Sequence, residues 1–249
     1  ASIRAGKDGE ELEGPANWEP ADTIDGLLRQ AAEVNDDKAE KAMLLEADKI
    51  GLQDLILFGL KGMAAYADHA QILGVEDEEV YAFFHEALDF LTKEDPTIDE
   101  LLSMALKCGK VNIKVMELLD KANTGTYGDP VPTPVRVTPV KGKAILISGH
   151  DLKDLEELLK QTQGKGINIY THGEMLPAHG YPELKKYPHL VGNYGSAWQD
   201  QRNEFENFPG AILMTTNCIQ RPKDTYKGRI FTSGLVAWPG VTHISDRNF

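Results

Sequence analysis

Cysteine, long apolar runs and positive charge are all scarce in this sequence. The 249 residues contain two cysteines, Cys108 and Cys218, too far apart in sequence for a metal knuckle. Two cysteines allow at most one disulfide, so a reducing cytoplasm is the favoured compartment. No segment approaches the roughly 18 consecutive apolar residues of a membrane helix. We therefore expect a cytoplasmic protein that does not enter a membrane.

Basic residues are outnumbered, with 26 Lys and Arg against 39 Asp and Glu, a net charge of −13. A nucleic-acid-binding protein needs a basic face that displaces phosphate counterions, so this class is excluded. The first residues, Ala1-Ser2-Ile3-Arg4, include no Met, and no basic run is followed by an apolar segment. This beginning is not a signal peptide and indicates a start in mid-chain.

The charge that is present is unevenly distributed. Residues 1–127 hold 27 acidic and 12 basic residues, a net charge of −15, whereas residues 128–249 hold 12 and 14, a net charge of +2. A cluster of Gly and Pro at 125–134 lies at this change, and proline cannot continue a helix. The pattern predicts two domains, residues 1–127 and residues 128–249.

The first of these domains is predicted to be helical. Apolar residues recur every three or four positions, which predicts helices over 20–34, 38–73, 77–93 and 97–123. Thr97 and Glu100 have the spacing of a capping box, and Gly59 and Gly62 are placed to allow two helices to approach closely. Cys108 is expected to lie on such a helix with its side chain in the core. The sequence therefore predicts an N-terminal helical bundle.

The second domain alternates short apolar runs with amphipathic segments. The runs predict strands over 144–148, 167–170, 190–192, 211–215 and 229–232, and the amphipathic segments predict helices over 151–163 and 196–207. Strands that alternate with helices form a parallel sheet with helices on both faces. We therefore expect a fold of class α plus α/β, with the bundle followed by a Rossmann-like parallel α/β domain.

Three side chains that bind metals follow three of the predicted strands. His150 follows the first strand, Glu174 the second and Cys218 the fourth. Ligands of open parallel sheets bind beyond the carboxyl ends of the strands. Neighbouring strands lie about 5 Å apart, so we expect these side chains to lie within about 12 Å of one another. Imidazole, carboxylate and thiolate together suit iron or zinc.

Each residue of this trio also has a structural interpretation. His150 is explained equally by a surface or capping role, Glu174 by a favourable charge at a helix N-terminus, and Cys218 by burial as a small apolar side chain. No dinucleotide-binding glycine motif, phosphate-binding loop or zinc-protease motif is present to decide between these alternatives.

Several longer segments of the second half resemble one family. The blocks are Ile-Ser-Gly-His-Asp-Leu-Lys-Asp at 147–154, Thr-His-Gly-Glu-Met-Leu-Pro-Ala-His-Gly-Tyr-Pro at 171–182, Val-Gly-Asn-Tyr-Gly at 191–195, Thr-Thr-Asn-Cys at 215–218 and Trp-Pro-Gly-Val at 238–241. They resemble the hybrid cluster proteins, also called prismane proteins or hydroxylamine reductases. The resemblance covers about residues 50–249, and a distant similarity to carbon monoxide dehydrogenases goes with it.

The resemblance implies a hybrid iron–sulfur–oxygen cluster with His150, Glu174 and Cys218 among its ligands. It makes His172 and Asn217 catalytic candidates beside the cluster, where they would hydrogen-bond a bridging oxygen or the substrate. The alternative for both is a structural role, as loop residues that satisfy nearby backbone groups. The implied reaction is reduction of hydroxylamine to ammonia and water, or of nitric oxide to nitrous oxide. A redox partner protein would supply electrons through a second iron–sulfur cluster.

The sequence also departs from the family pattern. The given sequence does not contain the N-terminal four-cysteine motif that holds the second cluster, and it ends at Phe249, where the family's further α/β domain with additional cysteine, glutamate and lysine ligands is expected to begin. We therefore expect an interior fragment with an incomplete ligand set, inactive alone. Such a chain is expected to self-associate or to bind the missing domain as a partner. The alternative is a non-catalytic helical–α/β module that docks a redox partner protein.

Overall fold

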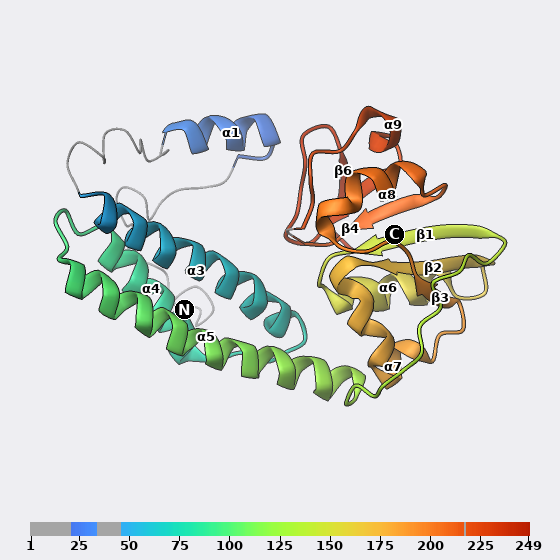
Figure 1. Ribbon diagram of the computed structural model, residues 1–249, viewed down its shortest axis with the longest axis horizontal. Coiled ribbons are helices and arrows are strands. Elements are labelled where there is room, and N and C mark those ends of the chain that lie inside the picture. Colours follow the sequence, from blue (N-terminus) through green and yellow to red (C-terminus); the bar gives the residue numbers. More distant parts are fainter. Residues whose placement is uncertain (1–20, 34–45, 217) are drawn as a thin grey trace. The chain divides into compact units, whose positions relative to one another are not determined.

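The computed structural model describes residues 21–33, 46–216 and 218–249 (Figure 1). The chain divides into two compact units, residues 1–46 and residues 47–249. The described part of the first unit forms helix α1 (Ile24–Glu33), inside the range predicted from periodicity. Positions 38–45 of the next predicted helix lie outside the described residues. All the elements that follow belong to the second unit.

Three long helices of the second unit lie side by side (Figure 1) and share one apolar core. They are α3 (Ala47–Ile72), α4 (Glu78–Leu91) and α5 (Ile98–Tyr127). The predicted capping box is present, because the Thr97 hydroxyl accepts from the Glu100 backbone and the Glu100 carboxylate accepts from the Thr97 backbone. Helix α5 runs one turn further than predicted, to Tyr127, and is followed by the C-cap residue Gly128, next to the change in charge.

The prediction that Cys108 is a core residue of a helix is confirmed, since it is buried in this cluster. A Cβ atom added at Gly59 would lie 3.0 Å from the Cys108 sulfur, so the glycine allows α3 and α5 to approach closely. Gly62 has open space around it, and the same prediction is wrong there. No described helix combines the length and apolar character that a membrane span requires.

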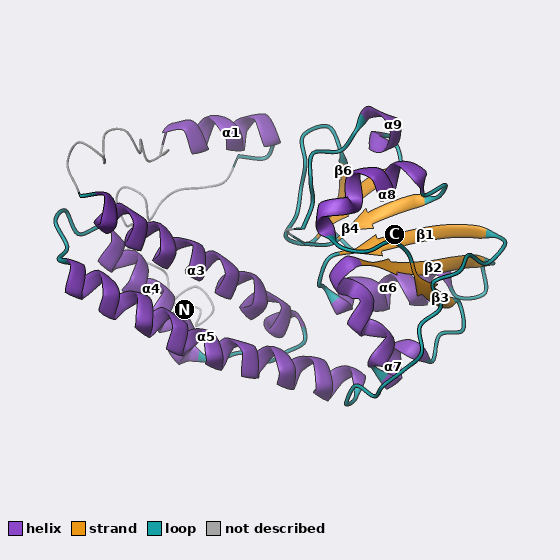
Figure 2. Cartoon of the chain, viewed as in Figure 1, coloured by secondary structure: helices purple, strands orange, loops and turns teal. Residues whose placement is uncertain are grey.

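Six parallel strands form one sheet in the order β3-β2-β1-β4-β5-β6 (Figure 2). The strands are β1 (Lys143–Ser148), β2 (Ile167–His172), β3 (Leu190–Asn193), β4 (Ala211–Met214), β5 (Ile230–Ser233) and β6 (Thr242–Ile244). The predicted parallel sheet is thus present. Strand β6 was not predicted, because it has three residues and two of them are exposed.

Helices cover both faces of this sheet. One face packs on α6 (Leu152–Thr162), the 3-10 helix η2 (Gly173–Gly180) and α7 (Pro182–Lys185). The other face packs on α8 (Gln201–Asn207) and α9 (Asp224–Lys227). The predicted helix over 196–207 is divided into the 3-10 helix η3 (Trp198–Asp200) and α8. Neighbouring residues such as Leu146 and Ile147 enter opposite cores, which requires apolar residues at consecutive strand positions.

The strand order reverses between β1 and β4. Strands β2 and β3 follow on one side of β1, while β5 and β6 follow on the other side of β4. Connections leave such a sheet in opposite directions at this point, and a crevice opens beyond the carboxyl ends of the two strands. The loops after β1 and β4 are therefore the places where a ligand site is expected.

The self-association expected from the sequence requires exposed apolar side chains, and the segment 235–238 is the candidate for them. Val236 is buried in the core on the α8 face, and Trp238 packs against the same core. Leu235 alone of the large side chains in this segment is exposed. The expectation is therefore wrong for Val236 and Trp238, because the loop after β5 folds back onto its own sheet.

Candidate metal centre

His150, Glu174 and Cys218 meet at the carboxyl edge of the sheet, in the loops after β1, β2 and β4. One ligand atom from each side chain lies within 4.8 Å of the other two. The Cys218 sulfur is 3.9 Å from His150 Nε2, and the same nitrogen hydrogen-bonds the Glu174 carboxylate. The predicted proximity is thus confirmed by distances well below the expected limit of about 12 Å.

The turn after β1 depends on Gly149. This residue has a φ of +118°, and a Cβ atom here would collide with the Thr215 hydroxyl and lie 2.8 Å from the Thr216 backbone nitrogen. The absence of a side chain therefore lets the end of β1 approach the loop after β4. His150 follows directly, and its Nδ1 lies 2.7 Å from the Thr216 hydroxyl. The Nε2 atom is left facing Glu174 and Cys218.

The Cys218 thiol is held in its neutral form. Burial and the nearby Glu174 carboxylate raise the pKa of Cys218 to about 11. Both effects disfavour the thiolate form of Cys218. A cation bound between the two side chains would favour the thiolate and so counteract both effects. The Glu174 side chain is about half exposed (54%) and lies in the first turn of η2. The site thus has one buried and one open side.

These three donors fit a metal-containing group. They supply a nitrogen, an oxygen and a sulfur atom at the same point, a mixture suited to iron or zinc rather than to calcium or magnesium. Over the described ranges 21–33, 46–216 and 218–249, this is the one group of three His, Cys, Asp or Glu side chains that converge in this way. The role of the trio as ligands stays a prediction.

The structure places His172 differently from the sequence analysis. Strand β2 runs through His172, so the residue ends the strand instead of lying in the following loop. It is fully buried, with Nδ1 2.9 Å from the Ser148 hydroxyl and Nε2 2.8 Å from the Glu204 carboxylate. Burial lowers the pKa of His172, although Glu204 opposes this shift. Both nitrogens join protein groups, and Asn217 lies outside the described residues.

Helix α3 adds two residues that the sequence analysis did not connect with the site. The Tyr66 ring lies edge-on to the His150 ring, with centroids 6.4 Å apart. Burial, Glu174 and Cys218 together raise the pKa of Tyr66. One turn further along the helix, His69 is buried, and its Nδ1 lies 3.8 Å from the Asp151 carboxylate. In the sequence, only the three-residue spacing of Tyr66 and His69, which places both on one side of a helix, relates to these contacts with the site.

Comparison with known proteins identifies the family of this chain. The family model described as the prismane/CO dehydrogenase family matches residues 6–248. The chain belongs to this family. Membership of it implies an iron–sulfur cofactor, and the donor set of the strand-end trio is compatible with one. The resemblance found in the sequence blocks is thus confirmed at the level of the family.

Curated relatives named hydroxylamine reductase are similar over almost the whole chain. The protein of Syntrophobacter fumaroxidans is 59% identical over 234 residues, 94% of this chain and 43% of the relative. Those of Rhodospirillum rubrum and Thermodesulfovibrio yellowstonii are 60% and 57% identical, over 96% and 93% of this chain and 43% and 42% of the relatives. The chain therefore spans less than half the length of these relatives.

Proposed function

We propose that His150, Glu174 and Cys218 are ligands of a hybrid iron–sulfur–oxygen cluster in an enzyme that reduces hydroxylamine to ammonia and water. The observation that carries this proposal is the convergence of the three ligand atoms within 4.8 Å, at the edge of the sheet where ligands bind. The names of the relatives supply the substrate.

The reaction breaks the N–O bond of hydroxylamine and consumes two electrons and two protons, which end in N–H and O–H bonds. When bound, the cluster would supply the electrons and an open iron position for the N–O group. Thr216 fixes the orientation of the His150 ring through Nδ1. Tyr66 covers one side of that ring, and the half-exposed Glu174 lies where protons can enter from water.

The proposal extends to a whole protein longer than this chain. Three side chains are too few to hold a cluster of several irons, so the other ligands would come from parts of such a protein that this chain does not span. The same proposal includes a second iron–sulfur cluster, a redox protein as electron donor and a location in the cytoplasm. It also includes the division of this chain into a helical bundle domain (1–127) and an α/β domain (128–249). Nitric oxide reduction to nitrous oxide is the alternative reaction.

The test uses the full-length protein that contains this sequence, prepared without oxygen and loaded with iron and sulfide. Reduced viologen dye supplies electrons, and both dye oxidation and ammonia are measured. We expect Cys218→Ser and His150→Ala to lower the rate more than about 100-fold, beyond the loss typical of groups that only support a ligand. Iron content should fall with the rate.

Cys108→Ser is the matched control, because this cysteine lies in the helical core away from the trio. It should keep its iron and most of its rate. A Cys218→Ser protein with full iron content and undiminished ammonia production would contradict the proposed ligand set.

The acidic first half supports one alternative, a non-catalytic module that docks a basic redox protein. The net charge of −15 over residues 1–127 is the observation that favours it. A docking module would stay colourless after reconstitution of the full-length protein and would still bind a basic redox protein in a salt-dependent way. Self-association through the α/β half would appear in light scattering at high salt.

A further inference from the structure

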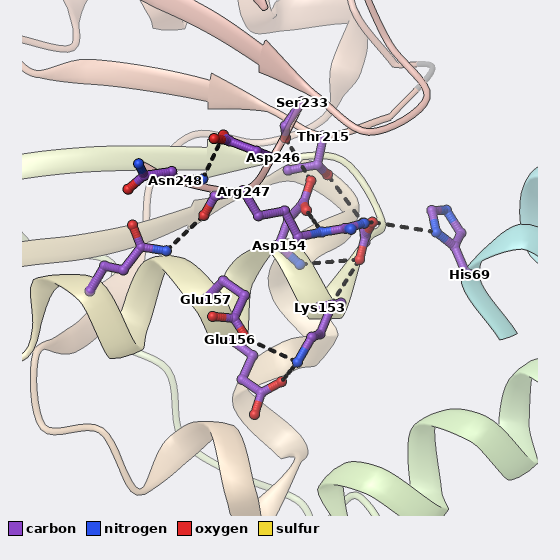
Figure 3. Close-up of polar contacts among 12 residues, drawn as sticks. His69, Lys153, Asp154, Glu156, Glu157, Thr215, Ser233, Asp246, Arg247 and Asn248 are labelled. Carbon is purple, nitrogen blue, oxygen red and sulfur yellow. Dashed lines mark hydrogen bonds and ion pairs between the residues drawn. The ribbon is translucent and has the colours of Figure 1, made fainter. Parts of the chain in front are cut away.

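Two buried carboxylates share one arginine at the N-terminus of α6 (Figure 3). Asp151 and Asp154 are 3% and 0% exposed. Arg247 Nε donates to Asp154 at 2.5 Å, and its Nη2 donates to Asp151 at 3.2 Å. The second oxygen of Asp154 accepts from the Ser233 hydroxyl at 2.6 Å. Arg247 is therefore a cation that both buried carboxylates share, and it offsets part of the repulsion between them.

The contact of Arg247 with the two carboxylates is accompanied by an unfavourable backbone conformation at Arg247. Its φ is +54°, and among the described residues it is the one non-glycine residue with a positive φ. Such strain persists where the surroundings enforce it. The enforcing contacts come from Gln161 near the far end of α6, which donates to the Arg247 carbonyl at 2.7 Å and accepts from the Phe249 backbone at 2.8 Å.

Asp151 connects this cluster to the metal centre, because it directly follows His150. One oxygen of Asp151 caps α6 by accepting from the backbone nitrogens of Lys153 and Asp154, at 2.8 and 3.2 Å. The other oxygen faces Arg247, with His69 from α3 3.8 Å away. The carboxylate thus anchors the backbone immediately after His150 from two directions.

We propose that Arg247 is a positioning residue for the metal centre. By contacting both Asp151 and Asp154, it holds the backbone of the loop after β1 where the His150 imidazole meets Glu174 and Cys218. This inference rests on the proposed function, because it treats His150 as a metal ligand. Without Arg247, the two carboxylates repel each other with no cation between them, and Asp151 leaves the place from which it anchors His150.

The direction in which metal affinity changes distinguishes a positioning role of Arg247 from a purely electrostatic role. Removing a positive charge near a cation site reduces the Coulomb repulsion of the cation. A purely electrostatic role of Arg247 therefore predicts tighter metal binding when the arginine is replaced by a neutral residue. Loss of the ligand position predicts weaker binding, about 10–100-fold when a group that supports a ligand is removed. Metal affinity therefore distinguishes the two roles without any measurement of catalysis.

The test titrates the purified chain with Co²⁺ alone, without oxygen and at one fixed pH, and follows the thiolate-to-cobalt absorption. We expect Arg247→Gln to weaken Co²⁺ binding about 10–100-fold. Arg247→Lys keeps the charge and should recover part of the loss. Asp154→Asn combined with Arg247→Gln removes one of the two repelling charges, and we expect it to bind Co²⁺ within about threefold of Asp154→Asn alone.

Arg229→Gln is the matched control. Arg229 donates to the backbone carbonyls of Phe205, Glu206 and Gly210, so this variant loses the same charge and comparable hydrogen bonds away from the two carboxylates. Its thermal stability should fall while its Co²⁺ affinity stays within about threefold of the unaltered chain. A role of Arg247 in stability alone predicts the same behaviour for Arg247→Gln.

The outcomes are distinguishable. No Co²⁺ binding by the unaltered chain would show that the three side chains do not form a metal site in this chain, and would overturn the premise of the positioning role. Normal binding by that chain, with equal or tighter binding by Arg247→Gln, would overturn the positioning role and leave the ligand set intact. If Arg247→Gln does not fold, Arg247→Lys and the double variant decide. Failure of the double variant to recover affinity would overturn the charge-balance explanation.

Discussion

At the scale of single residues, Gly149 and Thr216 determine where the His150 imidazole lies. Gly149 lets the end of β1 approach the loop after β4, and Thr216 holds the ring by its Nδ1 atom. The sequence shows that His150 follows a strand, but it does not show that a threonine beyond another strand fixes the ring. That contact depends on β1 and β4 being neighbours, and the order of strands is a tertiary property.

Gly149→Ala is expected to lower the free energy of unfolding by about 3 kcal/mol or more. The positive φ costs roughly 1–3 kcal/mol for a residue with a side chain, and the collision with Thr215 and Thr216 adds to it. Gly164→Ala is the control, since Gly164 also has a positive φ, +74°, but no atom near its Cβ position. Urea unfolding measures both, and equal losses would contradict the role of the close approach.

Thr216→Val is expected to weaken Co²⁺ binding about 10–100-fold, because it removes the hydrogen bond that orients His150 while keeping the shape of the side chain. Thr216→Ser keeps the hydroxyl and should bind within about threefold of the unaltered chain. Optical titration of the metal measures both affinities. Equal affinity of the valine and serine variants would show that the hydroxyl does not orient the ring.

At the scale of elements, periodicity and apolar runs predict the long helices and five of the six strands, because each has enough residues to show a pattern. Strand β6, α7 and α9 are too short for this. The strand-end rule predicts the trio, since it needs the direction of the strands but not their order. Tyr66 and His69 could not be predicted, because their place beside His150 and Asp151 depends on how α3 packs.

The 3-10 helix η2 carries Glu174 and is attached to the sheet through His179. This residue is buried, and its Nε2 lies 2.9 Å from the Thr171 hydroxyl on β2. Burial lowers the pKa of His179 below its usual value of about 6.5, although a hydrogen bond with the Gly192 backbone opposes the shift. Below pH 6.5 the unfolded chain therefore binds more protons than the folded chain at this position.

It follows that His179 makes the protein less stable as pH falls below about 6.5, by at most about 1.4 kcal/mol per pH unit. His179→Gln removes this titration, so its free energy of unfolding should fall less than that of the unaltered chain between pH 7.5 and 5.5. Urea unfolding at both pH values measures the difference. A fall in the free energy of unfolding that is equal in the two proteins between these pH values would contradict the role of His179.

At the scale of the whole second unit, the candidate metal centre lies against both the sheet and a long helix. His150, Glu174 and Cys218 come from the loops after β1, β2 and β4, while Tyr66 and His69 come from α3. Residues 47–249 form one compact unit. A metal that binds only the folded site stabilises every part that must unfold with it, by about 2.7 kcal/mol at a concentration 100 times the dissociation constant.

We therefore expect saturating Co²⁺ to slow amide hydrogen exchange in α3 around Tyr66 as well as in β1, β2 and β4. The reason is that opening the end of α3 removes the ring that covers His150 and the contact of His69 with Asp151. Exchange followed by mass spectrometry with and without Co²⁺ measures this. His150→Ala should abolish the increase everywhere. Slower exchange in the strands with no change in α3 would mean that the helix opens independently of the metal centre.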